Sequence, residues 1–178
     1  MSAATNAKNI KMILLDVDGV LTGGGIILDN KGNELKIFNS RDGMGITLAR
    51  SVGIRTGILT GRLSECVRKR SLELKIDVVE QGHFNKIPGL LSICEKSGIA
   101  EQEIAYMGDD VLDVNVMERV GIAAAPADAH FSARKAADYV TESRGGNGAV
   151  REFIDWILEA AGLLQSAYGH FTEDLKVR

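Results

Sequence analysis

The chain has 178 residues, of which 45% are hydrophobic and 25% are charged, and its formal net charge is −3. This composition is typical of a globular protein with one core, and it disfavours nucleic-acid binding because no block of Lys or Arg stands apart from acidic residues. No apolar run reaches the roughly 18 residues that a membrane-spanning helix needs. We therefore expect a single domain over residues 1–178, with neither nucleic acid nor a membrane as a partner.

The N-terminal segment, residues 1–9, is polar and lacks the apolar core of a signal peptide. It predicts a short disordered start. Cys66 and Cys94 have no partners at metal-ligand spacing, which favours packing roles for both. Together these features indicate a protein of the reducing cytoplasm.

Short apolar runs alternate with helical patterns along the rest of the chain. The apolar runs predict buried parallel strands at residues 10–17, 54–60, 104–107 and 121–124. The helical patterns occupy residues 45–51, 64–74, 86–97 and 112–120, with Ser64 at an N-cap position. This alternation predicts an α/β fold in which helices cover both faces of a parallel sheet.

One segment interrupts the alternation soon after the first predicted strand. Three consecutive glycines precede a short apolar run at residues 26–28, and a turn rich in Gly and Asn leads into a second run at residues 34–38. This pattern predicts a β-hairpin insert at about residues 23–39. The insert lies where a lid would cover the carboxyl edge of the sheet, and it is too small to form a cap domain.

The C-terminal part begins with a strong helical pattern. Residues 148–162 place their apolar side chains on one side of a predicted helix, at Val150, Phe153, Ile154, Ile157 and Leu158. From residue 160 the pattern is weak. We therefore expect a C-terminal helix and a tail without assigned structure over about residues 148–178.

Two acidic residues follow the first predicted strand. Carboxylates two positions apart on an extended chain point to opposite sides, so a bend is needed to bring Asp16 and Asp18 to one site. Gly19 can supply that bend. The alternative interpretation is a pair of solvated acids at the end of a strand.

A second acidic cluster follows the strand predicted at residues 104–107. Asp109 and Asp113 are four positions apart and share one face of a helix start, while Asp110 lies between them. Favourable interaction with the helix dipole is the simpler explanation. However, acids at the same sheet edge as Asp16 would repel one another, and Mg²⁺ with oxygen ligands removes that conflict.

Two further residues suit phosphate binding. Thr60 and Gly61 end a predicted strand, where a hydroxyl and a free backbone N–H can hold phosphate oxygens. Lys86 begins a predicted helix and can add a positive charge. A lone Thr or Lys carries little information, since most lysines only solvate a surface. Their positions nevertheless fit the carboxyl ends of the strands, where open α/β sheets bind ligands.

In chain order, Asp16-x-Asp18, Thr60, Lys86 and Gly108-Asp109-Asp110-x-x-Asp113 resemble the four motifs of the haloacid dehalogenase superfamily. The resemblance covers nearly the whole chain and implies a Rossmann-like core and a magnesium-dependent phosphatase. It implies that Asp16 is the nucleophile and that Asp18 protonates the leaving oxygen and then activates water. The other implied roles are metal binding by Asp16, Asp109 and the backbone carbonyl of Asp18, phosphoryl binding by Thr60 and Lys86, and support by Asp110 and Asp113.

Four segments narrow the resemblance to the 3-deoxy-D-manno-octulosonate 8-phosphate phosphatases, at residues 38–45, 60–62, 127–130 and 144–152. That family acts on a small phosphorylated sugar acid in lipopolysaccharide precursor synthesis and forms homotetramers in which the hairpins associate. The resemblance implies the same here. Arg62 suits the sugar carboxylate because its planar guanidinium can bind a carboxylate through two hydrogen bonds. The alternative for Arg62 is a surface side chain that caps a loop.

Two alternative functions and the role of one further residue remain open. A related phosphatase for a nine-carbon ulosonate 9-phosphate shares the hairpin, but an acidic residue tends to stand there at the position of Arg62. A non-catalytic oligomerisation domain, of the kind fused to sugar nucleotidyltransferases, has no need of the intact acidic motifs. Arg70, which follows Arg68 and Lys69, is a further candidate for substrate binding, either in this site or in that of a neighbouring subunit. A solvated helix face explains these three charges equally well.

Overall fold

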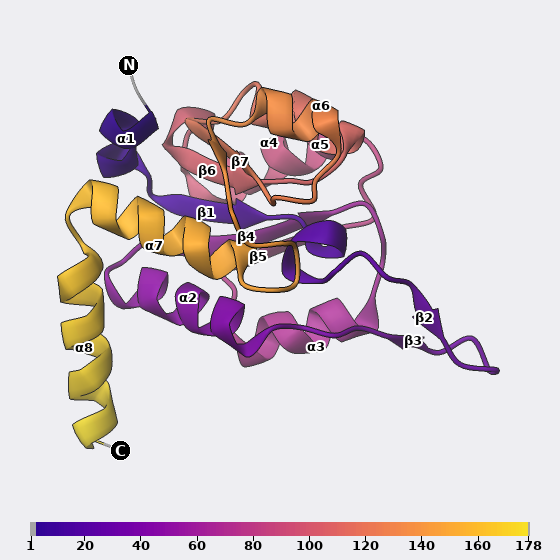
Figure 1. Ribbon diagram of the computed structural model, residues 1–178, viewed down its shortest axis with the longest axis horizontal. Helices are drawn as coiled ribbons and strands as arrows, with labels where there is room; N and C mark the ends of the chain where they lie inside the picture. The colour runs from indigo at the N-terminus through magenta and orange to yellow at the C-terminus, as the bar shows by residue number, and fades with distance from the viewer. Residues whose placement is uncertain (1–2, 178) are drawn as a thin grey trace.

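The computed structural model describes residues 3–177 and is built around a six-stranded sheet in the order β5-β4-β1-β6-β7-β8 (Figure 1). Every neighbouring pair of strands is parallel. The strands are β1 Met12–Leu15, β4 Arg55–Thr60, β5 Val78–Gln81, β6 Ile104–Met107, β7 Ile122–Ala125 and β8 Tyr139–Val140. The chain passes from β1 to one side of the sheet and later returns to the other side at β6. This reversal creates a crevice at the carboxyl ends of β1 and β6, where such sheets bind ligands.

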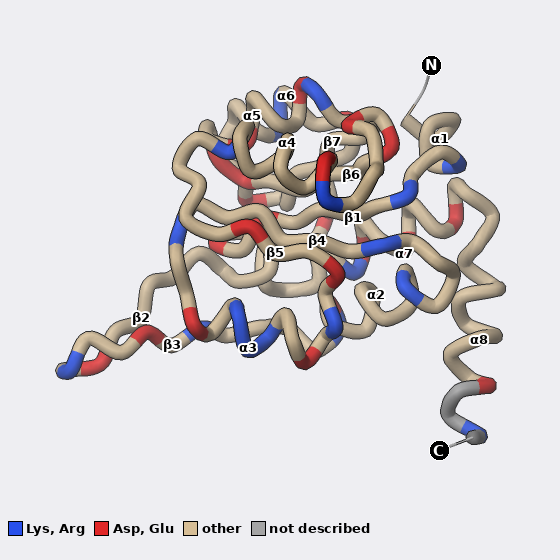
Figure 2. Tube along the Cα trace, turned by 180° about the vertical axis from the view of Figure 1, so that it is seen from behind, with Lys and Arg blue, Asp and Glu red and all other residues tan. Residues whose placement is uncertain are grey.

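Helices cover both faces of the sheet, as the sequence predicts. Figure 1 shows α4, α5 and α6 on one face and α2 and α7 on the other. The helices after the hairpin are α2 Ser40–Ser51, α3 Glu65–Glu73, α4 Lys86–Ser97, α5 Val111–Met117, α6 Phe131–Ala136, α7 Ala149–Ala161 and α8 Leu164–Val177. Ser64 caps α3, since its side chain accepts the N–H of Val67. In Figure 2, acidic and basic residues are interspersed along most of the chain, and α3 carries a run of basic residues.

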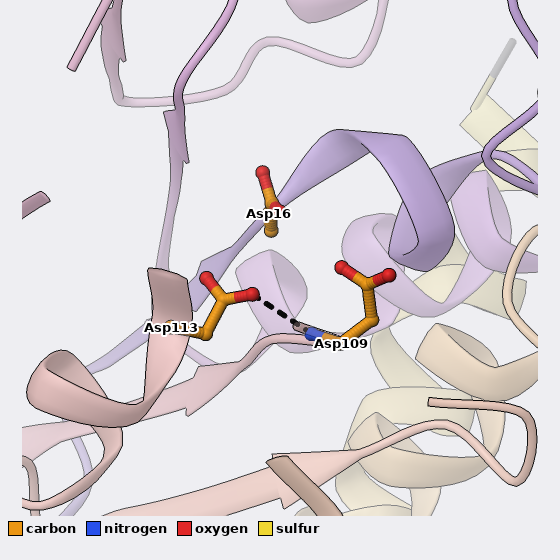
Figure 3. A group of neighbouring side chains, drawn as sticks. All are labelled: Asp16, Asp109 and Asp113. Atoms are coloured by element: carbon orange, nitrogen blue, oxygen red, sulfur yellow. Dashed lines mark hydrogen bonds between the residues drawn. The ribbon is translucent and has the colours of Figure 1, made fainter. Parts of the chain in front are cut away.

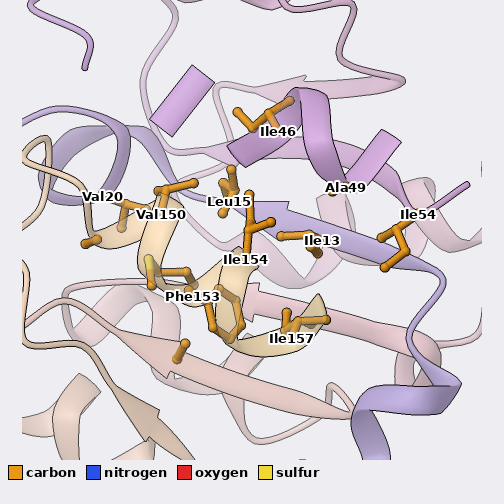
Figure 4. Close-up of a cluster of buried hydrophobic side chains, with 14 of the residues drawn as sticks. Ile13, Leu15, Val20, Ile46, Ala49, Ile54, Val150, Phe153, Ile154 and Ile157 are labelled. Carbon is orange, nitrogen blue, oxygen red and sulfur yellow. The ribbon is translucent and has the colours of Figure 1, made fainter. Parts of the chain in front are cut away.

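The central strand β1 is buried on both sides, which explains its continuous apolar sequence. Ile13 and Leu15 belong to a core formed with α2 and α7, where Phe153 is fully buried (Figure 4). Met12 and Leu14 point to the opposite core, formed with α4 and α5. The strand that carries the first acidic motif is therefore fixed from both sides.

The hairpin predicted at residues 23–39 is present. Its strands, β2 Ile27–Leu28 and β3 Glu34–Leu35, pair in antiparallel fashion and lie outside the main sheet (Figure 1). The Asp29 side chain accepts the N–H groups of Lys31 and Asn33 and so closes the turn. Because each strand has only two residues, the hairpin has little backbone pairing of its own.

One expectation about the chain ends is wrong, and a C-terminal segment whose structure the sequence does not assign is helical. Met1 and Ser2 lie outside the described residues, but residues 3–9 are helical rather than disordered, because buried Ala7 anchors them to the core. The C-terminal tail forms the helix α8, in which Ala167 is fully buried. Leu164 and Phe171 of the same helix also pack against the core, where they are partly buried. Among the described residues, no helix is long and apolar enough to cross a membrane.

Candidate active site

The loop after β1 brings two acidic motifs together. Asp16 accepts the N–H of Val17 at 2.7 Å, and the chain then turns through a distorted helical segment, Val17–Leu21. Gly19 supplies the expected bend with a positive φ of 89°. A Cβ atom at Gly19 would lie 2.0 Å from Oδ2 of Asp109, so a side chain here would push the second acidic motif away.

A glycine-rich loop packs directly on this turn. Gly146 donates its N–H to the carbonyl of Val20 at 2.8 Å, and a Cβ atom at Gly145 would lie 1.8 Å from the carbonyl oxygen of Gly19. Asp128 holds the loop by accepting the N–H of Gly145 at 2.9 Å. Two of the segments that resemble the phosphatase family therefore support the turn after β1, residues 144–152 by backbone contact and residues 127–130 through the Asp128 side chain.

Lys86 joins the two acidic motifs. It lies in the first turn of α4, its side chain is 2% exposed, and its Nζ is 2.8 Å from Oδ2 of Asp16 and 2.5 Å from Oδ1 of Asp113. Tyr106 donates its hydroxyl to the same oxygen of Asp113. The ammonium group therefore has a fixed position beside Asp16.

Asp113 is oriented by backbone as well as by side chains. Its Oδ2 accepts the N–H groups of Asp109 and Asp110 at 3.0 Å each, and Figure 3 shows the first of these bonds. Asp110 caps the start of α5. Because both oxygens of Asp113 already have partners, its role here is to position Lys86 and the loop that carries Asp109.

The charges of the site are strongly perturbed. Burial raises the pKa of Asp16 to about 6, although the nearby Lys86 ammonium opposes the shift. Burial, reinforced by the charges of Asp16 and Asp113, raises the pKa of Asp109 to about 8. Burial disfavours the Lys86 cation, but its two carboxylate neighbours outweigh that effect and raise its pKa. One lysine does not neutralise this group of carboxylates.

The acidic cluster fits a hard divalent cation. Oxygens of Asp16, Asp109 and Asp113 all lie within 4.8 Å of one another, and Figure 3 shows the three side chains around a common centre. Each oxygen of Asp113 already has two hydrogen-bond partners, whereas each oxygen of Asp16 has one and can accept a further contact. Among the described residues, the Asp109 carboxylate accepts no hydrogen bond, so Asp16 and Asp109 are the two carboxylates available to a cation. Two carboxylates are enough for Mg²⁺, which keeps several waters and binds phosphate oxygens.

The phosphate-binding candidates lie beside these acids. Thr60 ends β4 and is 2% exposed. A cavity of about 160 Å³ is lined by all of the predicted site residues except Arg70, and also by Leu112, namely Asp16, Asp18, Thr60, Gly61, Arg62, Lys86, Asp109, Asp110, Leu112 and Asp113. Arg70 lies elsewhere on α3, where its guanidinium is 5.9 Å from the ring of Phe38 and 2.8 Å from Glu73.

The hairpin adds two charged residues that sequence reasoning missed. Lys36 contacts the carboxylate of Asp18, and its side chain is 2% exposed. Glu34 accepts a hydrogen bond from Arg62 at 2.8 Å and lies 3.4 Å from Lys36. The alternation of charged and apolar residues over 34–37 is a signal that could have identified this face.

Comparisons with known proteins identify the family of this chain. The family model of the haloacid dehalogenase-like hydrolases matches residues 62–154. The 3-deoxy-D-manno-octulosonate 8-phosphate phosphatase of Salmonella typhi is 47% identical over 165 residues, which cover 93% of this chain and 88% of that protein. The Yersinia pestis enzyme of the same name has a solved structure with a TM-score of 0.89 and 39% identity, covering 92% of this chain and 88% of that one. The Moraxella catarrhalis enzyme was solved with magnesium, phosphate and 3-deoxy-D-manno-octulosonate (KDO). Its structure has a TM-score of 0.91 and 36% identity, covering 95% of this chain and 97% of that one.

Proposed function

Because the chain belongs to the 3-deoxy-D-manno-octulosonate 8-phosphate phosphatases of the haloacid dehalogenase-like hydrolases, we propose that it hydrolyses that sugar phosphate with Asp16 as the nucleophile. The protein is a magnesium-dependent phosphatase. The observation that supports the residue assignment best is the position of Asp16, at the end of β1 and 2.8 Å from Lys86. A carboxylate held beside a fixed cation is well placed to attack a phosphoryl group.

The proposed mechanism uses groups at the carboxyl edge of the sheet. Lys86, together with the hydroxyl of Thr60 and the N–H of Gly61, binds the phosphoryl oxygens and orients phosphorus toward Asp16. Asp16, Asp109 and the backbone carbonyl of Asp18 would hold Mg²⁺, which when bound would supply positive charge to the transferring group. Phosphoryl transfer needs little beyond such positioning and neutralisation of charge.

Asp18 carries the proton in this mechanism. Asp16 attacks phosphorus, and the bond to the ester oxygen breaks while Asp18 gives that oxygen a proton. Asp18, now ionised, then takes a proton from the water that hydrolyses the aspartyl phosphate. Its side chain lines the same cavity as Asp16, as both steps require.

The substrate carboxylate is assigned to Arg62. The guanidinium lines the cavity and is 41% exposed, so it retains hydrogen-bond donors for an incoming ligand. Lys86 and Thr60 would hold the phosphate end of the sugar, and Arg62 the acidic end.

We propose that the enzyme works as a homotetramer in the cytoplasm. Four apolar side chains of the hairpin are between 57% and 73% exposed, namely Ile26, Leu28, Leu35 and Ile37. A hairpin this small does not bury such residues by itself, which favours association. Both cysteines are free, as expected of a protein in a reducing compartment.

A panel of substrates tests the proposed function. Phosphate release with Mg²⁺ is measured for the eight-carbon ulosonate 8-phosphate, a nine-carbon ulosonate 9-phosphate and a neutral hexose 6-phosphate. The first should have the highest kcat/KM. A preference for the nine-carbon substrate would make that sugar phosphate the substrate. Inactivity on all three substrates would show that the protein is not a phosphatase for sugar phosphates.

The nucleophile is tested by Asp16→Asn, which keeps the shape of the side chain. We expect turnover to fall by on the order of 10⁴-fold or more, because the amide cannot form the covalent intermediate. Asp29→Asn, in the hairpin turn, is the matched control and should retain activity. Normal phosphate release by a folded Asp16→Asn protein would contradict the assignment.

A further inference from the structure

We propose that Lys36 is a positioning residue for Asp18: its ammonium group holds one oxygen of the Asp18 carboxyl and leaves the other free to transfer the proton. This inference rests on the proposed role of Asp18 as general acid and base. It gives the hairpin a part in the chemistry of its own protomer, in addition to any part in association.

The returning strand of the hairpin has two different faces. Glu34 and Lys36 point toward the site, with side chains 16% and 2% exposed. Leu35 and Ile37 point away, with exposures of 57% and 73%. Successive side chains of an extended chain alternate in this way, so one short segment presents charge to the cavity and apolar surface to the outside.

The contacts distinguish the two oxygens of Asp18. Oδ1 accepts a hydrogen bond from the Lys36 ammonium group and a weaker one from the Thr22 hydroxyl at 3.5 Å. Among the described residues, no hydrogen bond to Oδ2 is found, and Nε of Arg62 lies 3.9 Å from this oxygen. Oδ1 is therefore the anchored oxygen, and Oδ2 is the one available to substrate or water.

Lys36 is itself held in place by Glu34. One oxygen of Glu34 is 3.4 Å from Nζ of Lys36 and accepts the Arg62 hydrogen bond, while the other accepts the hydroxyl of Ser64, the residue that caps α3. The Ser64 hydrogen bond, with Lys36 and Arg62, holds the pKa of Glu34 below its usual range against the effect of burial. Glu34 therefore stays anionic and links Lys36 to the body of the protein.

A fixed orientation matters because Asp18 acts twice through one oxygen. In the first step, Asp16 bonds to phosphorus, the ester P–O bond breaks, and its electron pair accepts the proton from Oδ2. In the second step, water attacks phosphorus, its proton passes to Oδ2, and the bond from Asp16 to phosphorus breaks. A carboxyl group that rotated freely would spend part of its time with the wrong oxygen facing the ester.

The test uses leaving groups that differ in their need for a proton. Lys36→Met removes the ammonium group at similar length, Lys36→Arg keeps the charge, and Lys31→Met in the hairpin turn is the control. kcat/KM is measured for the acidic sugar phosphate, for a neutral hexose 6-phosphate and for 4-nitrophenyl phosphate. This constant reports the steps up to release of the leaving group, and the nitrophenolate leaves with little protonation.

We expect Lys36→Met to lower kcat/KM by about tenfold to a hundredfold for both alkyl phosphates, and by less than about threefold for the aryl phosphate. Lys36→Arg should restore most of the loss, and Lys31→Met should match the wild type. Equal losses on all three substrates would show a structural role and overturn the proposal. A loss confined to the acidic sugar phosphate would make Lys36 a carboxylate-binding residue and overturn it as well.

Asp18→Asn, measured in parallel, separates this inference from the function on which it rests. If Asp18→Asn does not discriminate between alkyl and aryl phosphates, the proposed role of Asp18 fails. If Asp18→Asn discriminates and Lys36→Met does not, the positioning role alone fails. Circular dichroism checks the fold of each variant, and Lys36→Gln carries the same expectations if Lys36→Met does not fold.

Discussion

Two lysine side chains flank the site, and each is only 2% exposed, but they are supported in different ways. Lys86 comes from α4 and pairs with Asp16 and Asp113, whose positions follow from the packing of the sheet. Lys36 comes from a hairpin that pairs with no strand of the main sheet, and its ion pairs hold it in place. The core thus fixes the cation that is proposed to bind phosphate, while contacts between side chains fix the cation beside Asp18.

The largest expected effect is that of replacing Lys86, and it should exceed the effect of replacing Lys36. Lys86→Met should lower phosphatase activity by on the order of 10³-fold, because the phosphoryl group loses its fixed positive charge. It should also lower the free energy of unfolding by about 3 kcal/mol, because Asp16 and Asp113 would remain buried without a cation. For Lys36→Met we expect the free energy of unfolding to fall by only about 1 kcal/mol, since Asp18 and Glu34 are accessible enough for water to hydrate them.

Urea unfolding without metal measures this difference. Lys96→Met is a suitable control because the Lys96 side chain is 63% exposed in its pair with Glu80. Equal losses of stability in Lys36→Met and Lys86→Met would contradict the contrast between hairpin and core.

Metal removal should affect the sheet edge in a way that depends on pH. EDTA should abolish activity, and Mg²⁺ should restore it. The raised pKa values of Asp16, about 6, and Asp109, about 8, mean that the metal-free folded protein binds protons more readily than the unfolded chain. The contribution of these two carboxyl groups to the stability of the metal-free protein should therefore be greatest at about pH 4 and below, and it should be lost as the pH rises to about 8.

Mg²⁺ competes with those protons, so it should raise the melting temperature more at pH 8 than at pH 5.5. Thermal unfolding with and without Mg²⁺ at the two pH values measures this. Asp109→Asn should remove most of the pH dependence. A metal effect that is independent of pH would show that the two carboxylates are not the ligands.

A smaller effect concerns substrate choice at the hairpin side. Arg62→Ala should lower kcat/KM on acidic ulosonate phosphates by about tenfold to a hundredfold, the value of one charge-assisted pair. Neutral sugar phosphates and 4-nitrophenyl phosphate should change little, because they have no carboxylate for the guanidinium. Equal losses on all three would make Arg62 a phosphate-binding or structural residue.

Substitutions at the outer face of the hairpin should have the smallest effect on catalysis and should act on association. The double variant Ile26→Ser/Leu28→Ser should shift the protein toward smaller species in light scattering at micromolar concentration, because it removes exposed apolar surface. Leu91→Ser, at an exposed position of α4, is the control and should leave the mass unchanged. A monomeric wild-type protein would refute the proposed tetramer.

The same contrast explains which features the sequence could predict. The buried strands β1 and β6 and their acidic ends were predictable, because a strand covered on both faces is apolar throughout and its polar end stands out. The edge strand β5 was not identified, since all four of its residues are half-buried and two are polar. The start of α2 at Ser40 was also missed, because glycines at 43 and 45 obscure its first turns.

The charged face of the hairpin was missed for a different reason. Glu34 and Lys36 belong to no motif, and an acid and a base two positions apart usually solvate a surface. Their meaning depends on where the hairpin lies relative to Asp18, which local pattern does not specify. Tyr106, in the middle of a predicted strand, was also missed, because only tertiary packing brings its hydroxyl within hydrogen-bond distance of Asp113.

The central position of β1 has a consequence for how the protein is made. β1 pairs with β4 on one side and with β6 on the other, where Met12 lies opposite Ile104. A ribosome needs about 5–20 s to add the roughly 90 residues between these partners. During that interval the nascent chain carries Asp16 without Asp109, so the two proposed metal ligands meet only when synthesis is well past the middle of the chain. Phosphatase activity should therefore appear late and abruptly during translation.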